Sequence, residues 1–184
     1  MPLVGVMLIG VLSALGGGML RDVLLTVPVV AMRDQWYLPV AVSAALLGMP
    51  LARRIIEHPW IGLLLDGLVL GLFTLVGTEK ALALDFPVAT AIFVGLTTSI
   101  GGGTIVELLV GLRPSVLQRG PWFATAALVG AMLTAVLHGR APDNLVAVLS
   151  VAVVAVLRVV SVRKDWAAPS VTTLQQLRRR SGQD

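Results

Sequence analysis

Two triplets of glycine stand in apolar stretches of the chain, and charged residues follow each of them. Gly16–Gly18 lie in "ALGGGMLRDVLL" and precede Arg21 and Asp22. Gly101–Gly103 lie in "SIGGGTIVELL" and precede Glu107. Glycine costs a helix about 1 kcal/mol per residue relative to alanine, so three in a row should nearly break the helix that carries them. Backbone carbonyls freed in this way can replace part of a cation's hydration shell, which predicts a hinge that lines a permeation path.

The same residues allow structural interpretations. Small residues let helices pack closely in membranes, and this alternative applies to Gly16, Gly17, Gly18, Gly101, Gly102 and Gly103. The charged residues behind the triplets lie near helix ends, where they can reach the headgroups or pair with each other. An arginine inside a cation pore would repel its cargo, so we favour a gate or a lipid contact for Arg21, Asp22 and Glu107 over a selectivity filter.

Asp66 lies about seven residues inside a predicted apolar helix. Carboxylates within a membrane are usually functional or paired. We expect Asp66 either to pair with a basic group of a neighbouring helix or to draw cations toward the mouth of a pore. Glu79 and Lys80 lie at the other end of the same helix and are expected to be solvated.

Several kinds of chemistry are not expected from this chain. "GGGMLR" lacks the third glycine of a dinucleotide fingerprint, and no phosphate-binding loop with lysine is present. There is no cysteine, and neither His58 nor His138 has a partner at ligand-like spacing. No nucleophile stands beside a base. We therefore expect no enzyme, no cofactor and no metal site.

The composition indicates a membrane protein that must position these residues on helices. Of 184 residues, 57% are hydrophobic and 13% are charged, and the mean hydropathy is +0.91. An ordinary soluble domain has roughly 25% charged residues. The net charge of +4 is explained by basic loops rather than by nucleic-acid binding.

Apolar runs bounded by turn residues and charges predict a polytopic all-α fold with six spans. The predicted helices cover 2–25, 36–52, 60–80, 87–111, 122–138 and 144–162. We expect a single transmembrane domain over 1–162, followed by a polar, basic cytoplasmic tail over 163–184.

The distribution of basic residues predicts the orientation. If the helices alternate, one side receives Arg53, Arg54, Arg113, Arg119, Arg163, Lys164, Arg178, Arg179 and Arg180, and the other receives Arg33, Lys80 and Arg140. The side with nine should be cytoplasmic, which places both termini of this chain in the cytoplasm.

The chain also repeats itself. A shift of 85 residues lays the first glycine triplet on the second and Asp22 on Glu107. With one inserted residue, the match continues through a proline, an arginine and an aromatic pair. The two glycine helices are the first and fourth of six, so they cross the bilayer in opposite directions. We interpret this as an inverted repeat, which is typical of transport proteins.

The two copies differ in one respect. A full span over 60–80 precedes the second glycine helix, whereas only 15 residues precede Gly16. Repeat one (1–54) therefore lacks its first helix relative to repeat two (58–138), and 144–162 is an extra helix. Either the start codon has been placed too late, or the chain is a truncated form of a seven-helix protein.

These motifs resemble the bacterial membrane family that carries the domain named "glycine transporter", which is similar to the prokaryotic trimeric intracellular cation channels. The resemblance rests on "GGGMLRDVLL", "LLDGLVLGLFTLVGTEKAL" and "TSIGGGTIVELL" with the segments behind the triplets. It implies a homotrimer of seven-helix protomers, each with its own pore and with kinks at the glycine triplets. This chain departs from it in its absent first helix and in Val106, which takes the place that Arg21 has in the first copy.

The sequence therefore predicts a channel for monovalent cations, with potassium implied by the resemblance, in the bacterial inner membrane. A carrier for a small zwitterion such as glycine is the first alternative. The second is a membrane fragment without transport activity. The expected partners are the lipid bilayer, the transported solute and two further copies of the chain, and not nucleic acid.

Overall fold

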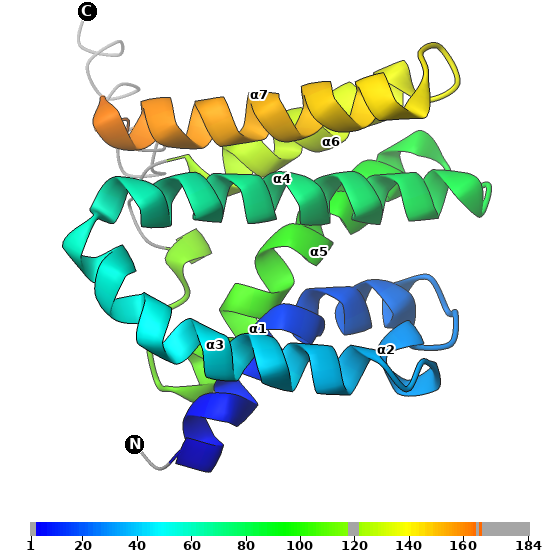
Figure 1. Ribbon diagram of the computed structural model, residues 1–184. Helices are drawn as coiled ribbons and strands as arrows, with labels where there is room; N and C mark the ends of the chain where they lie inside the picture. Colours follow the sequence, from blue (N-terminus) through cyan, green and yellow to red (C-terminus); the bar gives the residue numbers. More distant parts are fainter. Residues whose placement is uncertain (1–2, 118–121, 165, 167–184) are drawn as a thin grey trace, which may run out of the picture.

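The computed structural model describes residues 3–117, 122–164 and 166, and all the regular secondary structure in these residues is helical (Figure 1). The six long helices are α1 (Leu3–Leu24), α3 (Tyr37–Glu57), α4 (Pro59–Ala83), α5 (Val88–Leu109), α6 (Phe123–Leu137) and α7 (Asp143–Arg163). Two short elements, α2 (Val30–Arg33) and the 3-10 helix η1 (Ser115–Leu117), follow α1 and α5. The all-α prediction is confirmed. Most of the predicted tail, and Arg119, lie outside the described residues.

The predicted helices agree with the observed ones except at the end of α3. This helix continues to Glu57, whereas the sequence predicted an end at residue 52. The helix stops only at His58, whose backbone (φ −125°, ψ 77°) leaves the helical region because Pro59 follows. The short elements α2 and η1 were not predicted, because they lie in segments that carry prolines and charges.

Four of the helices are long and apolar enough to span a membrane: α1, α4, α5 and α7. The apolar part of α3 covers only Tyr37–Ala52, and α6 has 15 residues, fewer than the about 20 that a straight span needs. The sequence predicted six spans, and the residues that the structure describes contain four of full length and two shorter apolar helices.

Helix α4 is the central element of the bundle. It packs against α5, α6 and α7, while α1 packs against α5 and α3 (Figure 1). Alanines, glycines and threonines make up most of the buried residues of these helices, as is usual where helix backbones approach closely in membranes. Figure 1 also shows that α1 and α5 run in opposite directions and that each changes direction along its length.

Candidate functional site

The two glycine triplets meet where α1 crosses α5. Gly17 lies against the carbonyl oxygen of Thr98, and Gly102 lies against that of Ser13. A β-carbon at Gly102 would stand 2.6 Å from the Ser13 oxygen, and one at Gly17 would overlap the Thr98 oxygen. Because backbone atoms are the obstacle on both sides, only glycine allows this crossing at these positions.

The contacts at the crossing come in pairs, in which the residues of one contact lie 85 positions from the corresponding residues of the other. The contact of Gly17 with Thr98 corresponds to that of Gly102 with Ser13. In the same way, Gly16 faces Gly102 and Ile105, while Gly101 faces Gly17 and Leu20. The third glycines, Gly18 and Gly103, both have open space where a β-carbon would stand. Residues that correspond in sequence therefore have the same surroundings.

Helical structure continues through both triplets, although the sequence suggested that each would nearly break its helix. The close crossing offers an explanation, because contacts between the two backbones offset the low helix propensity of glycine. The first two glycines of each triplet are thus packed, and the third one is open on the side where a side chain would lie.

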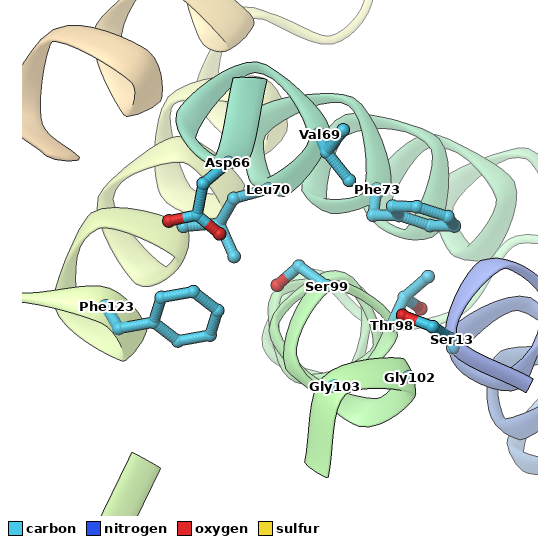
Figure 2. Close-up of a pocket in the computed structure, with 11 residues that line it drawn as sticks. Ser13, Asp66, Val69, Leu70, Phe73, Thr98, Ser99, Gly102, Gly103 and Phe123 are labelled. Carbon is cyan, nitrogen blue, oxygen red and sulfur yellow. The ribbon is translucent and has the colours of Figure 1, made fainter. Parts of the chain in front are cut away.

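A cavity of about 130 Å³ lies beside the crossing (Figure 2). Its wall includes Gly17, Gly102 and Gly103 from the crossing. The polar side chains in the wall are Ser13, Thr98, Ser99 and Asp66, of which Asp66 is the one ionisable group among the described lining residues. Figure 2 shows the Asp66 carboxylate on the same side of the cavity as the Ser99 hydroxyl and the Phe123 ring. The cavity can thus offer hydroxyl and carboxylate oxygens to a small polar solute.

Asp66 forms an ion pair with Arg158 of α7, with 2.8 Å between Nε and Oδ2. Arg158 also lies over the ring of Phe123, 5.0 Å from its centroid, and its Nη1 is buried without a hydrogen-bond partner. The side chain of Asp66 is 42% exposed, against 16% for Arg158. The carboxylate therefore keeps one side toward the cavity while the arginine neutralises it from the other.

A second charged cluster lies at the opposite end of α4. The Asp22 side chain, 2% exposed, accepts hydrogen bonds from Arg21 Nε at 2.8 Å and from Lys80 Nζ at 2.7 Å. Its other oxygen accepts the backbone N–H of Val30 at 3.0 Å, where α2 begins. Lys80 was expected to be solvated, and this was wrong, because the lysine crosses from α4 to neutralise a buried carboxylate.

Glu107 occupies the corresponding place in the second copy. It accepts the backbone N–H of Ser115 at 2.8 Å, at the start of η1, and it also accepts the Ser115 hydroxyl. Asp22 and Val30 are eight residues apart, as are Glu107 and Ser115. Each carboxylate therefore fixes the short helical element behind its own glycine helix. The roles of gate and lipid contact for Arg21, Asp22 and Glu107 stay predictions.

A larger cavity, of about 310 Å³, lies on the Asp22 side of the bundle. Its wall includes Gly18, Arg21 and Asp22, together with Tyr37 of α3 and three residues of α4. The third glycine of each triplet therefore lines a cavity, Gly103 the smaller one and Gly18 the larger one. The sequence interpretation gave no role to Arg158 and expected Lys80 to be solvated, whereas both neutralise carboxylates of the site.

Comparison with known proteins places these features in a family. The family model described as "Glycine transporter" matches residues 1–53 and 63–139. The UPF0126 inner membrane protein YadS of Escherichia coli (strain K12) is 31% identical over 170 residues, which cover 90% of this chain and 82% of YadS.

Two solved structures share the fold. A TRIC cation channel studied for conductance aligns with a TM-score of 0.83 and 27% identity, over 92% of this chain and 84% of that one. The TRIC trimeric intracellular cation channel orthologue from Rhodobacter sphaeroides aligns with a TM-score of 0.73 and 28% identity, over 85% of this chain and 91% of that one. The resemblance expected from the glycine motifs is confirmed.

Proposed function

The chain belongs to the glycine transporter family, and from that premise we propose that it is a membrane channel for monovalent cations rather than an enzyme. The observation that carries the proposal is the cavity beside the crossing of α1 and α5, which combines glycine backbone, hydroxyls and the carboxylate of Asp66. Backbone carbonyl, hydroxyl and carboxylate oxygens can replace part of the hydration shell of an ion. The fold shared with TRIC cation channels supports the same function, with potassium as the expected ion.

In this proposal the site residues have distinct roles. Gly16, Gly17, Gly101 and Gly102 hold the crossing, and Gly18 and Gly103 leave room for the ion. Asp66 attracts cations at one mouth of the path. Arg21, Asp22 and Glu107 hold the segments behind the glycine helices and act as a gate or as lipid contacts.

The proposal includes an inverted repeat, a trimer and an orientation. The paired contacts of the two triplets and the opposite directions of α1 and α5 support the inverted repeat. Asp66 and Arg158 lie near the predicted cytoplasmic ends of α4 and α7, and their ion pair is consistent with that topology. The similar inner membrane protein YadS supports a place in the bacterial inner membrane, and the trimeric TRIC orthologue supports a homotrimer. The basic loops support a cytoplasmic position for both termini.

The experiment is potassium flux through liposomes that contain the purified protein, followed by single-channel recording in planar bilayers. Gly103→Val should reduce the flux because the valine side chain would narrow the cavity. The fold should tolerate the change, since no atom lies within 4 Å of a β-carbon at that site. Gly48→Val is the matched control, because Gly48 lies on α3, is exposed and also has open space. Absence of flux above protein-free liposomes would refute the channel.

The second candidate function is a carrier for a small zwitterion, which the name of the family favours. Asp66 would hold the ammonium group, and the unpartnered Nη1 of Arg158 would hold the carboxylate. Saturable uptake of labelled glycine without single-channel steps would support this carrier and exclude the channel. Unitary currents with no glycine uptake would do the reverse.

A further inference from the structure

Two cavities are lined by successive parts of α4, and one side chain of this helix lines both. The smaller cavity is lined by Asp66, Val69 and Leu70 of this helix, and the larger one by Leu72 and Val76. Phe73 lines both cavities and is the one described residue that the two walls share. Figure 2 shows its ring at the side of the smaller cavity that lies nearest α1.

The residues before and after Phe73 form a continuous stripe on α4. Asp66, Val69, Phe73, Val76 and Lys80 follow each other at steps of three or four, which places them on one helix face. The ends of the stripe are charged and are neutralised, Asp66 by Arg158 and Lys80 by Asp22. The middle of the stripe is apolar, and the aromatic ring is its largest side chain.

On the α1 side, neighbouring glycines line the two cavities. Gly17 of α1 lines the smaller cavity, and its neighbour Gly18 lines the larger one. Neither residue has a side chain, so Phe73 is the group that fills the space between the cavities from the α4 side. The two cavities thus share one aromatic ring in their walls.

We propose that Phe73 is the hydrophobic constriction between two half-paths, one formed by the smaller cavity with Asp66 in its wall and the other by the larger cavity with Asp22 in its wall. The inference rests on the proposed transport function and adds the residue that closes the path. A narrow apolar passage excludes water, and without water it presents a barrier to ions. A ring between two cavities, each with charged residues in its wall, meets that condition.

The first test measures access and does not depend on what is transported. The chain contains no cysteine, so Val69→Cys and Val76→Cys each introduce a single thiol, one in each half-path. Vesicles of both orientations are treated with a charged, membrane-impermeant methanethiosulfonate. With Phe73 in place, the two thiols should react from opposite sides of the membrane. Reaction of both from the same side would overturn the proposal.

In the second test, Phe73→Ala is added to each single-cysteine protein. The labelling rate from the far side should rise at least about tenfold, since the transfer free energy of one aromatic ring corresponds to such a factor. Phe73→Leu, a milder change, should give a smaller rise and guards against misfolding of the alanine variant. Phe93→Ala is the matched control, because Phe93 lies on α5 and is 55% exposed. An unchanged far-side rate in both Phe73 variants, or an equal rise with Phe93→Ala, would refute the constriction.

Potassium flux separates this inference from the proposed function. A rise in flux with Phe73→Ala and not with Phe93→Ala supports both. If neither variant nor the wild type conducts while the labelling results hold, the channel is wrong and the constriction stands. If the wild type conducts and Phe73→Ala changes neither flux nor labelling, the constriction is wrong and the channel stands.

Discussion

Alanine at the middle glycine of either triplet should destabilise the protein, although alanine is the better helix former. A β-carbon at Gly102 would lie 2.6 Å from the carbonyl oxygen of Ser13, and one at Gly17 would overlap that of Thr98. Ordinary contacts between carbon and carbonyl oxygen are about 3.3–3.6 Å, so the two helices would have to separate by close to 1 Å at the crossing. Overpacking of this kind costs about 1–3 kcal/mol.

The net effect also includes the higher helix propensity of alanine, which returns about 1 kcal/mol. We therefore expect Gly17→Ala and Gly102→Ala each to lower the free energy of unfolding by up to about 2 kcal/mol. Because one separation of the helices relieves both clashes, the double variant should lose less than the sum of the single losses.

Gly18→Ala and Gly103→Ala provide the controls within the same triplets. Neither added β-carbon meets an atom within 4 Å, so both variants should be as stable as the wild type or more stable. Reversible unfolding of the purified protein in mixed micelles, followed by circular dichroism, measures the four differences. If Gly17→Ala is as stable as Gly18→Ala, the close crossing is not what requires glycine.

Four further predictions concern polar contacts. Asp22→Asn should lower the free energy of unfolding by about 3 kcal/mol, because it removes the buried partner of two cations, whereas Asp34→Asn at an exposed site should change it little in the same unfolding assay. Arg158→Gln should raise the cation flux through liposomes about fourfold. This factor is the Boltzmann weight of the repulsion between a cation and a unit positive charge about 5 Å away in bulk water, which the variant removes. Unchanged or lower flux would contradict the prediction. Asp66→Asn should lower the free energy of unfolding more than Arg158→Gln does, because it leaves the more buried charge of the pair, Arg158, without its partner. Thr134→Val should cost about 1 kcal/mol by removing a buried hydrogen bond between α6 and α7, and a loss below the error of the unfolding measurement would contradict it.

The helices could be predicted from the sequence because their signals are local. Apolar runs of span length and prolines at helix starts determine where α4 and α5 begin. The same local signals failed at the end of α3, where charges in "RRIIE" suggested a loop although none of those residues breaks a helix. Charge marks where a helix leaves the apolar core, and this need not be where the helix ends.

The sequence suggested that Asp66 could pair with a neighbouring helix, but the partners of Asp22 and Asp66 on other helices could not be identified because they lie in distant segments. Asp22 is 58 residues from Lys80, and Asp66 is 92 residues from Arg158. A partial signal was present in the topology. Both members of each pair lie at a similar distance from the same predicted membrane surface, so matching charges by depth would have proposed them. Which helices are neighbours would still have been missing, because it depends on packing that no periodicity shows.

The third glycine of each triplet is the strongest structural argument for a passage. Close packing accounts for Gly17 and Gly102, which face backbone atoms. It does not account for Gly18 and Gly103, because an alanine at either site would meet no other atom and would favour the helix by about 1 kcal/mol. Both residues instead line cavities, where a methyl group would take up space. A glycine that is unfavourable for folding and unnecessary for packing within the chain is explained if something must pass beside it.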